Sequence, residues 1–257
     1  MKLRQQYLAL STIVLKEIRR FTRIWVQTIL PAAITMTLYF VIFGNLIGSQ
    51  LNNIHGLQYI DYIVPGVILM AIINNSYANV VSSFFSAKFQ RHIEEMLVSP
   101  MPNYLILLGF VGGGLARGLI VGIAVTVVAS FFVELRFYHP WIVMTVVLLT
   151  SVLFALGGLI NAVFAKSFDD ISIIPTFVLT PLTYLGGIFY SVEMLPGVWQ
   201  SISYANPILY MINAMRFGML GVSDIDVRVA LLIIIGFVVF LYSFALYLLR
   251  TGVGIRN

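Results

Sequence analysis

Six apolar runs, each long enough to cross a lipid bilayer, limit what this chain can fold into. A helix of about 20 apolar residues spans the hydrocarbon core of a bilayer. The chain is 60% hydrophobic and 10% charged, whereas a soluble globule carries about 25% charged residues. The sequence therefore predicts one all-α polytopic membrane domain over residues 1–257, with six transmembrane helices at 24–47, 58–85, 104–133, 141–165, 171–190 and 229–249.

The basic residues are unevenly placed around these runs. Lys and Arg concentrate in the short cytoplasmic loops of membrane proteins. With the N-terminus inside, only Arg136, Arg216 and Arg228 lie outside, and Arg117 falls within a run. The pattern predicts that both termini are cytoplasmic. The net charge of +5 is then a feature of membrane topology, and we expect no nucleic-acid partner.

Two segments outside the runs have a pattern of their own. In residues 5–23, apolar side chains fall on one helical face and basic side chains on the opposite face, which predicts an amphipathic helix in the headgroup layer in contact with anionic lipid. The alternative is a basic flank that only sets the topology. Residues 192–216 are apolar and aromatic but interrupted by Pro196, Gly197 and Pro207, which predicts a broken hairpin of two short helices re-entering from the outer surface.

Searches for catalytic and metal-binding motifs find no candidates. The chain has no cysteine, no HExxH and no GxSxG, and no histidine–carboxylate cluster on one helix face. It also lacks GxxxxGK[ST], the loop that cradles nucleotide phosphates. We therefore expect no metal, no catalytic residue and no nucleotide-binding domain in this chain.

A few residues stand out inside the runs. Gly114, Gly118 and Gly122 repeat every four residues and predict close helix packing, either within one subunit or between subunits. Arg117 lies among them, and an intramembrane charge faces a partner or a cavity. An ion pair with Asp169 or Asp170 and a contact with substrate are the two interpretations. Asn74 and Asn75 either hold helices together or line a pathway.

A short charged segment interrupts the apolar sequence. The stretch FQRHIEEMLVSPMP, residues 89–102, carries Arg91, Glu94 and Glu95 and ends at two prolines, which cannot continue a helix. Taken alone, this pattern is typical of a solvated loop whose charges keep it out of lipid.

Three stretches resemble one known family. YIDYIVPGVILM in the second run, EEMLVSP in the charged segment, and PTFVLTPLTYLGGIFYSVEMLPGVWQSISYANPILY occur in the order and spacing of the membrane subunits of type-2 ATP-binding-cassette exporters. This group contains polysaccharide, Nod-factor and drug exporter permeases. The resemblance covers nearly the whole chain.

The resemblance implies a function for the charged segment. In this family two permeases pair and dock onto two copies of a separate ATPase chain, which carries the ATP and Mg. A cytoplasmic coupling helix between spans two and three inserts into the ATPase, and it corresponds to residues 86–99 here. Charged contacts from Arg91, Glu94 and Glu95 would set partner specificity, Met96 and Leu97 would fill the groove on the ATPase, and Ser99 and Pro100 would end the helix.

The resemblance also implies export across a bacterial inner membrane by a homodimer. Spans one, two and five would line the pathway, and the substrate would be an amphipathic or hydrophobic molecule such as a lipid-linked glycan, a lipid or a drug. Aromatic residues near the outer ends of these spans are candidates for a gate or substrate platform, or for a belt that faces lipid: Tyr39, Phe40, Phe43, Tyr184, Phe189 and Tyr190.

Two other functions remain open from the sequence. An ion-coupled carrier or channel without an ATPase needs a buried carboxylate, and Asp61 is the one candidate, near the outer end of a span. A membrane enzyme needs a catalytic group at depth, and none is evident. Neither function accounts for the charged segment.

Overall fold

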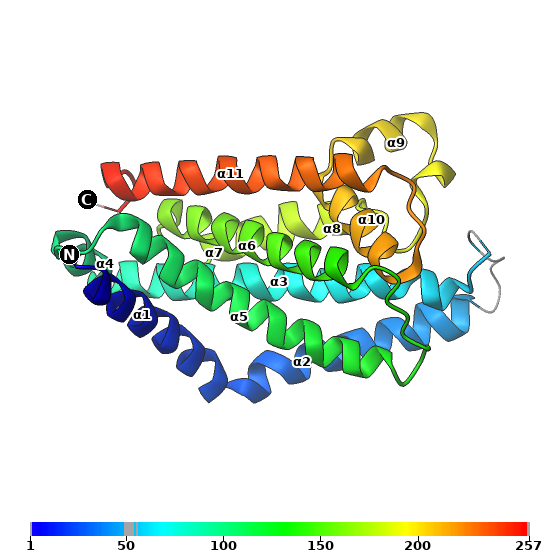
Figure 1. Ribbon diagram of the computed structural model, residues 1–257, viewed down its shortest axis with the longest axis horizontal. Coiled ribbons are helices and arrows are strands. Elements are labelled where there is room, and N and C mark those ends of the chain that lie inside the picture. Colours follow the sequence, from blue (N-terminus) through cyan, green and yellow to red (C-terminus); the bar gives the residue numbers. More distant parts are fainter. Residues whose placement is uncertain (1, 49–53, 55, 256–257) are drawn as a thin grey trace.

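The computed structural model describes residues 2–48, 54 and 56–255, and this part of the chain is helical apart from turns and one isolated bridge between Ile54 and Leu57. The long helices lie side by side along the length of the molecule (Figure 1). The start of α1 (Leu3–Arg23), α4 (His92–Val98) and the end of α11 (Val227–Thr251) lie at one end, and α9 (Gly197–Tyr204) lies at the other. The predicted all-α class is confirmed.

Helix α3 (Tyr59–Phe89) is the centre of the fold. It packs against α5 (Asn103–Ala129), α6 (Pro140–Phe164) and α10 (Pro207–Leu220). Every residue from Tyr62 to Ile73 is buried, because the N-terminal half of α3 is surrounded on all sides. In contrast, α2 (Trp25–Tyr39) and α11 expose most of their apolar surface. Such exposed apolar helices are stable only against lipid or another protein chain.

The glycine strip of α5 packs inside the subunit. A Cβ at Gly114 would lie 2.5 Å from Val80 Cγ2 and 2.9 Å from Ala155 Cβ. A Cβ at Gly122 would lie 2.8 Å from Ile72 Cδ1, and one at Gly118 would overlap Ser76 Oγ. These three glycines therefore let α3 and α6 approach the α5 backbone. Of the two sequence-based alternatives, the structure has the packing within one subunit.

The N-terminal helix α1 packs against α5 through a face that only partly coincides with the predicted apolar face, which included Phe21 but not Ile13 or Glu17. Its buried residues are Ile13, Glu17 and Phe21, spaced four apart. Gly109 and Gly113 on α5 receive it, since a Cβ at these positions would overlap Ile13 and Glu17. The residues expected on its apolar face include Tyr7, which is exposed. Placement of α1 in the headgroup layer stays a prediction.

Five helices in the described part of the chain are long and apolar enough to cross a membrane, by length and composition. The predicted span at 171–190 has a different form. It consists of α7 (Asp170–Ile174), the π-helix η3 (Pro175–Leu179) and α8 (Thr180–Tyr184), and it ends at Tyr184. Two prolines, Pro175 and Pro181, interrupt the regular hydrogen bonding there. The count of six spans therefore stays a prediction.

The first long helix also contains π-helix. Helix α2 continues as η1 (Phe40–Ile47), so that Trp25–Gly44 forms one apolar segment. In the structure, π-helical turns thus occur in both the first run and the fifth. Such turns are frequent at functional sites because they shift side chains out of the regular helical register.

The segment predicted as a broken hairpin contains η4 (Val192–Met194), α9 and α10, and α10 runs on to Leu220. Asn206 caps α10 by accepting from the Ile208 N–H at 3.0 Å. Helix α10 is largely buried, and Arg216 on it is 1% exposed. Its guanidinium lies 3.8 Å from the Tyr62 ring centroid and donates to Gly187 O at 2.7 Å. Arg216 therefore fastens α10 to α3 and to the turn after α8.

Candidate functional site

The charged segment folds as a turn and a short helix. The sequence predicted one helix over 86–99, but α3 continues to Phe89 and α4 spans only His92–Val98. Between them, Arg91 has φ 62°, and it is the one non-glycine residue with positive φ in the described part of the chain. A left-handed residue ends a helix. The expected single helix is therefore wrong, and α4 is a separate element set at an angle to α3.

Helix α4 has two distinct faces. Ile93 is fully buried, and Met96 and Leu97, three and four residues further on, are half-buried against the core. The opposite face, which we call the outward face of α4, consists of Arg91, Glu94, Glu95 and Val98, all exposed. Val98 is 82% exposed.

This arrangement corrects the roles expected of two residues. Met96 and Leu97 pack largely against their own subunit, because the spacing of Ile93, Met96 and Leu97 places them on one side of a helix. Val98 and, at the end of α3, Phe89 are the apolar residues that remain exposed. Neither residue was predicted from the sequence, since an isolated exposed apolar residue has no pattern of its own.

Side-chain hydrogen bonds form on either side of α4. Before it, Lys88 Nζ donates to the carbonyl oxygens of Val163 at 2.5 Å and Ala165 at 2.8 Å, at the C-terminal end of α6. A cation at this position also complements the helix dipole. After it, Ser99 Oγ donates to Met96 O at 2.6 Å, and the exposed Pro100 follows. Lys88 thus joins the end of α3 to the end of α6, and the buried Ile93 packs α4 against the core.

A groove of about 740 Å³ lies beside α4. Its walls carry Lys88, Arg91 and Lys166, with Glu94 as the one acid among the lining residues. Phe85, Phe89 and Phe168 form an aromatic cluster at its edge, with ring centroids 4.9 Å apart for Phe85–Phe168 and 5.4 Å for Phe89–Phe168. This end of the molecule thus combines a basic groove, exposed aromatic rings and the outward face of α4.

The part of α3 nearer to α4 exposes a polar stripe. From position 74 onward, the residues of α3 that are not buried are small or polar up to residue 86. These are Asn74, Asn75, Ala78, Ser82 and Ser86, which we call the α3 stripe. Asn74 is exposed and Asn75 is half-buried. Small polar side chains open along one line of an otherwise buried helix are consistent with a water-accessible pathway.

Arg117 lies at the edge of this stripe. Its Nε donates to Asn75 Oδ1 at 3.3 Å. The expected ion pair with Asp169 or Asp170 is wrong, because Asp170 instead accepts the backbone N–H groups of Lys166 at 2.8 Å and Ser167 at 3.1 Å. Hydrogen bonds from the Lys166 N–H and from Ser167 hold the pKa of the Asp170 carboxyl below its usual range.

A buried polar network joins α1 to α3 near Arg117. Glu17, fully buried, accepts from Ser83 Oγ at 2.6 Å and lies 3.3 Å from both Lys16 Nζ and Arg20 Nη2. Arg20 Nη2 donates to Asn79 Oδ1 at 2.8 Å and to Asn79 O at 2.9 Å. The burial of Glu17 was not predicted from the sequence, because its neighbours on the chain predict a solvated basic face.

Four of the predicted aromatic residues come together from the α2–η1 helix and from the end of α8 and the turn that follows it. Phe189 stacks on Phe43 at 4.6 Å and on Tyr39 at 5.6 Å between ring centroids, and Tyr184 lies 6.0 Å away. The hydroxyls of Tyr39 and Tyr184 are 2.8 Å apart. Tyr190 joins the edge of this aromatic cluster by donating to Tyr184 O at 3.1 Å.

Phe40 does not belong to this cluster. It is fully buried and lies 5.5 Å from the Phe132 ring centroid, inside the core. Its assignment to a pathway is therefore wrong. The reason is that adjacent residues of a helix point in directions about 100° apart, so Tyr39 and Phe40 cannot both face the same space.

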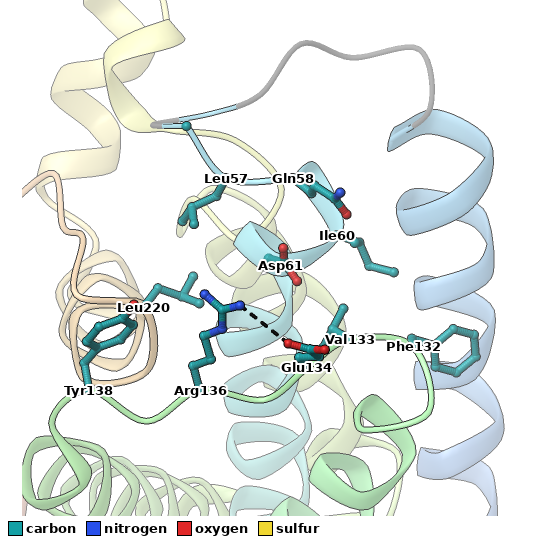
Figure 2. A pocket seen from close by; sticks show the side chains of 11 residues that line it. Leu57, Gln58, Ile60, Asp61, Phe132, Val133, Glu134, Arg136, Tyr138 and Leu220 are labelled. Atoms are coloured by element: carbon teal, nitrogen blue, oxygen red, sulfur yellow. Dashed lines mark hydrogen bonds and ion pairs between the residues drawn. The ribbon is translucent and has the colours of Figure 1, made fainter.

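A separate polar pocket of about 430 Å³ lies at the opposite end of the molecule from α4. Figure 2 shows Asp61, at the start of α3, beside Glu134 and Arg136 of the α5–α6 connection. Arg136 and Glu134 form a pair at 3.5 Å, and both are largely exposed. Among the described residues, no group of three histidine or carboxylate side chains is close enough to hold a metal.

The long apolar helices, the polar stripe of α3 and the exposed charged helix α4 together define a multi-pass membrane protein of the transporter class. Residues 9–220 match the ABC-2 type transporter family, and the chain belongs to this family. The resemblance predicted from the sequence is thus confirmed.

The similar proteins agree with this family. The chain is 55% identical to the inner membrane transport permease YadH of Escherichia coli (strain K12) over 252 residues, 98% of both chains. It is 24% identical to nodulation protein J of Rhizobium leguminosarum bv. viciae over 212 residues, 81% of this chain and 82% of the relative. Identity to nodulation protein J of Neorhizobium galegae is 26% over 212 residues.

Proposed function

We propose that this chain is the transmembrane subunit of an ABC exporter, and that two copies pair and couple to two copies of a separate ATPase chain. The observation that carries this proposal is α4. It is a short helix that follows directly on α3, with Ile93 buried on one side and with Arg91, Glu94, Glu95 and Val98 turned outward. An exposed charged face beside a basic, aromatic groove fits a wet protein interface in which charges set partner specificity.

In this proposal, helix α3 links α4 at one end of the molecule to the aromatic cluster near the other end. ATP and Mg are bound by the partner ATPase in this account, and closure of the ATPase chains moves α4. Since α3 is continuous from Tyr59 to Phe89, the movement reaches its outer end, where Tyr59 donates to Phe189 O at 2.9 Å. The aromatic cluster of Tyr39, Phe43, Tyr184 and Phe189 then opens or closes.

The pathway in this account runs between two copies of the chain. The α3 stripe forms its cytoplasmic half and the aromatic cluster its outer half, with α2 and the α7–α8 segment as walls. Tyr39, Tyr184 and Phe189 present aromatic faces, which stack on sugar rings or on planar apolar groups. An amphipathic or hydrophobic substrate, exported across a bacterial inner membrane, fits these surfaces. The name of the YadH relative supports the inner-membrane location.

The test measures ATP hydrolysis in lipid nanodiscs by the chain co-expressed with the ATPase encoded beside it. Wild type is compared with the double substitution Glu94→Ala, Glu95→Ala. The matched control is Glu134→Ala, Glu193→Ala, which also removes two exposed acids but at sites far from α4. We expect the first variant to weaken the complex by about tenfold and the control to leave it unchanged.

Two results would contradict the proposal. One is that no ATPase co-purifies with the wild-type chain. The other is that the α4 variant hydrolyses ATP as the control does. Either result would favour an ion-coupled carrier, in which Asp61 of the outer pocket is the residue to examine next.

A further inference from the structure

Two arginines from different helices reach the same stretch of α3. Arg20 on α1 donates to Asn79 Oδ1 at 2.8 Å, and Arg117 on α5 donates to Asn75 Oδ1 at 3.3 Å. Asn75 and Asn79 are four residues apart and therefore lie one helical turn apart on one side of α3. We call Arg20 and Arg117 the arginine pair.

The packing register of α1 on α5 places this pair at the end of α1. Ile13 lies over Gly109, and Glu17 lies over Gly113. The next step of four residues along each helix pairs Phe21 with Arg117. By this register Arg117 falls near the end of α1, and α1 and α2 both pack on α5.

The charges in this region do not balance. Lys16 and Arg20 both lie 3.3 Å from the same carboxylate, that of Glu17. In the described part of the chain, no carboxylate lies within 4 Å of Arg117. Three cations therefore share one acid. A charge within a membrane-spanning helix is costly unless a partner group compensates it, so the site is suited to an anion from outside the chain.

The surface next to the pair is apolar. At the α1–α2 corner, Ile24 is 41%, Trp25 58% and Val26 46% exposed. A ligand that meets both surfaces has an anionic headgroup for the guanidiniums and an apolar tail for α2. Guanidinium groups bind phosphate oxygens in a bidentate manner more readily than other cationic side chains do.

We propose that the arginine pair binds the phosphate-class headgroup of an amphipathic substrate as it enters from the cytoplasmic side, with its tail along the exposed face of α2. This inference rests on the proposed export function and specifies its substrate class. The same chemistry is present in a resident acidic lipid, so the experiment separates the two.

Trp25 provides a reporter at the site. The chain has three tryptophans, and Trp141→Phe with Trp199→Phe leaves Trp25 as the single fluorophore, since Trp141 and Trp199 are exposed side chains. The quenching of Trp25 is measured in bilayers without any ATPase. Brominated dioleoyl phosphatidate and brominated dioleoyl phosphatidylcholine are tested separately, each in competition with the unbrominated form of the other lipid. We expect phosphatidate to bind on the order of tenfold more tightly than phosphatidylcholine.

The variants show whether Arg117 causes this preference. Arg117→Gln should bring the ratio of the two binding constants close to one, and Arg117→Lys should keep part of it. Arg228→Gln removes one exposed cation at the start of α11 and should leave the ratio unchanged. Equal quenching by the two lipids in the wild-type background, or an unchanged ratio in Arg117→Gln, would overturn the proposal. The measurement on the chain with Arg117 intact shows whether the site prefers phosphatidate, even if a variant fails to fold.

Two further arms identify the source of the phosphate. Soluble glycerol 1-phosphate should not displace brominated phosphatidate, and full displacement would show that the site needs no apolar tail and would overturn the amphipathic part. With the ATPase present, ATP turnover should relieve the quenching as the ligand leaves. Quenching that is unaffected by turnover would identify a resident lipid and overturn the substrate part. Because the binding arms need no ATPase, their outcome is independent of the test of ATPase coupling.

Discussion

At the scale of single residues, the informative ones are those whose surroundings differ from what their type predicts. Glu17 is an acid on a helix with basic neighbours, yet it is fully buried and joins Ser83 to Lys16 and Arg20. Its position at Gly113, where no side chain competes for space, makes this contact possible. Glu17 therefore holds α1 against α3 and α5.

Substitution of Glu17 should weaken this attachment. In Glu17→Gln, the buried hydrogen bond with Ser83 loses its charge and the two cations lose their carboxylate. Because Lys16 and Arg20 are partly exposed, we expect a loss of about 1–3 kcal/mol, seen as a Tm lower by roughly 2–8 °C in scanning fluorimetry. The control Glu134→Gln, whose side chain is 90% exposed, should leave the Tm unchanged. An equal Tm for both variants would contradict the role given to Glu17.

At the scale of elements, the junction of α3, α4 and α6 transmits force only if it is stiff. Lys88 is the residue that closes it, because its ammonium group binds the last carbonyl groups of α6. The adjacent turn at Arg91 then sets the direction of α4.

Lys88→Met should loosen the end of α6. Removing a cation from a helix C-terminus costs about 0.3–1 kcal/mol, so we expect hydrogen exchange of amides 162–165 to be a few-fold faster, as measured by mass spectrometry. Lys166→Met is the control, since Lys166 is exposed and lies next to the same carbonyl groups without a hydrogen bond from its side chain in the described structure. Unchanged exchange in Lys88→Met would show that the junction does not depend on Lys88.

The close approach of α3 to α5 depends on Gly118. A Cβ at this position would overlap Ser76 Oγ, and overpacking of this kind costs about 1–3 kcal/mol. We expect Gly118→Ala to lower the yield of monodisperse protein in size-exclusion chromatography. Gly236→Ala, in α11, meets no atom within 4 Å and should be neutral or slightly stabilising. The same yield from both variants would contradict the packing described for α5.

Elements differ in how far the sequence could predict them. The long helices follow from apolar length alone, and Gly114, Gly118 and Gly122 were recognisable by their spacing. The turn at Arg91 was not predictable, because arginine has no preference for positive φ. The short fifth segment was also missed. Its apolar composition satisfies a span, but length and composition take no account of Pro175 and Pro181, which interrupt the regular hydrogen bonding of the segment.

The candidate site was predictable to a smaller extent. The residue types of α4 were found, but not which side each occupies, because seven residues are too few for a reliable apolar period. The members of the aromatic cluster were predicted, but Phe40 was wrongly included with them, because its burial against Phe132 of the distant α5–α6 connection leaves no local pattern. Contacts between Arg117 and Asn75, or between Glu17 and Ser83, join helices far apart in the sequence and leave no local pattern.

At the scale of the whole molecule, the exposed surfaces of the chain are those of a subunit. The α3 stripe is polar at membrane depth, α2 and α11 are apolar and exposed, and α4 presents charges at the end of the central helix. Each surface suits a different neighbour. In our account these neighbours are a second copy of the chain beside the α3 stripe, lipid beside the exposed apolar helices, and an ATPase chain beside α4. The central claim is that the outward face of α4 binds this ATPase.

Single-cysteine labelling tests this claim most directly, because the chain has no cysteine of its own. Glu94→Cys and Val98→Cys place one thiol on the outward face of α4, Leu97→Cys places one on its half-buried side, and Arg228→Cys is the control at the opposite end. The rate of maleimide labelling is measured with and without the co-expressed ATPase. Our account predicts that the ATPase slows labelling at 94 and 98 by about tenfold or more and leaves 228 unchanged. Equal rates at 94 and 98 with and without the ATPase would contradict it.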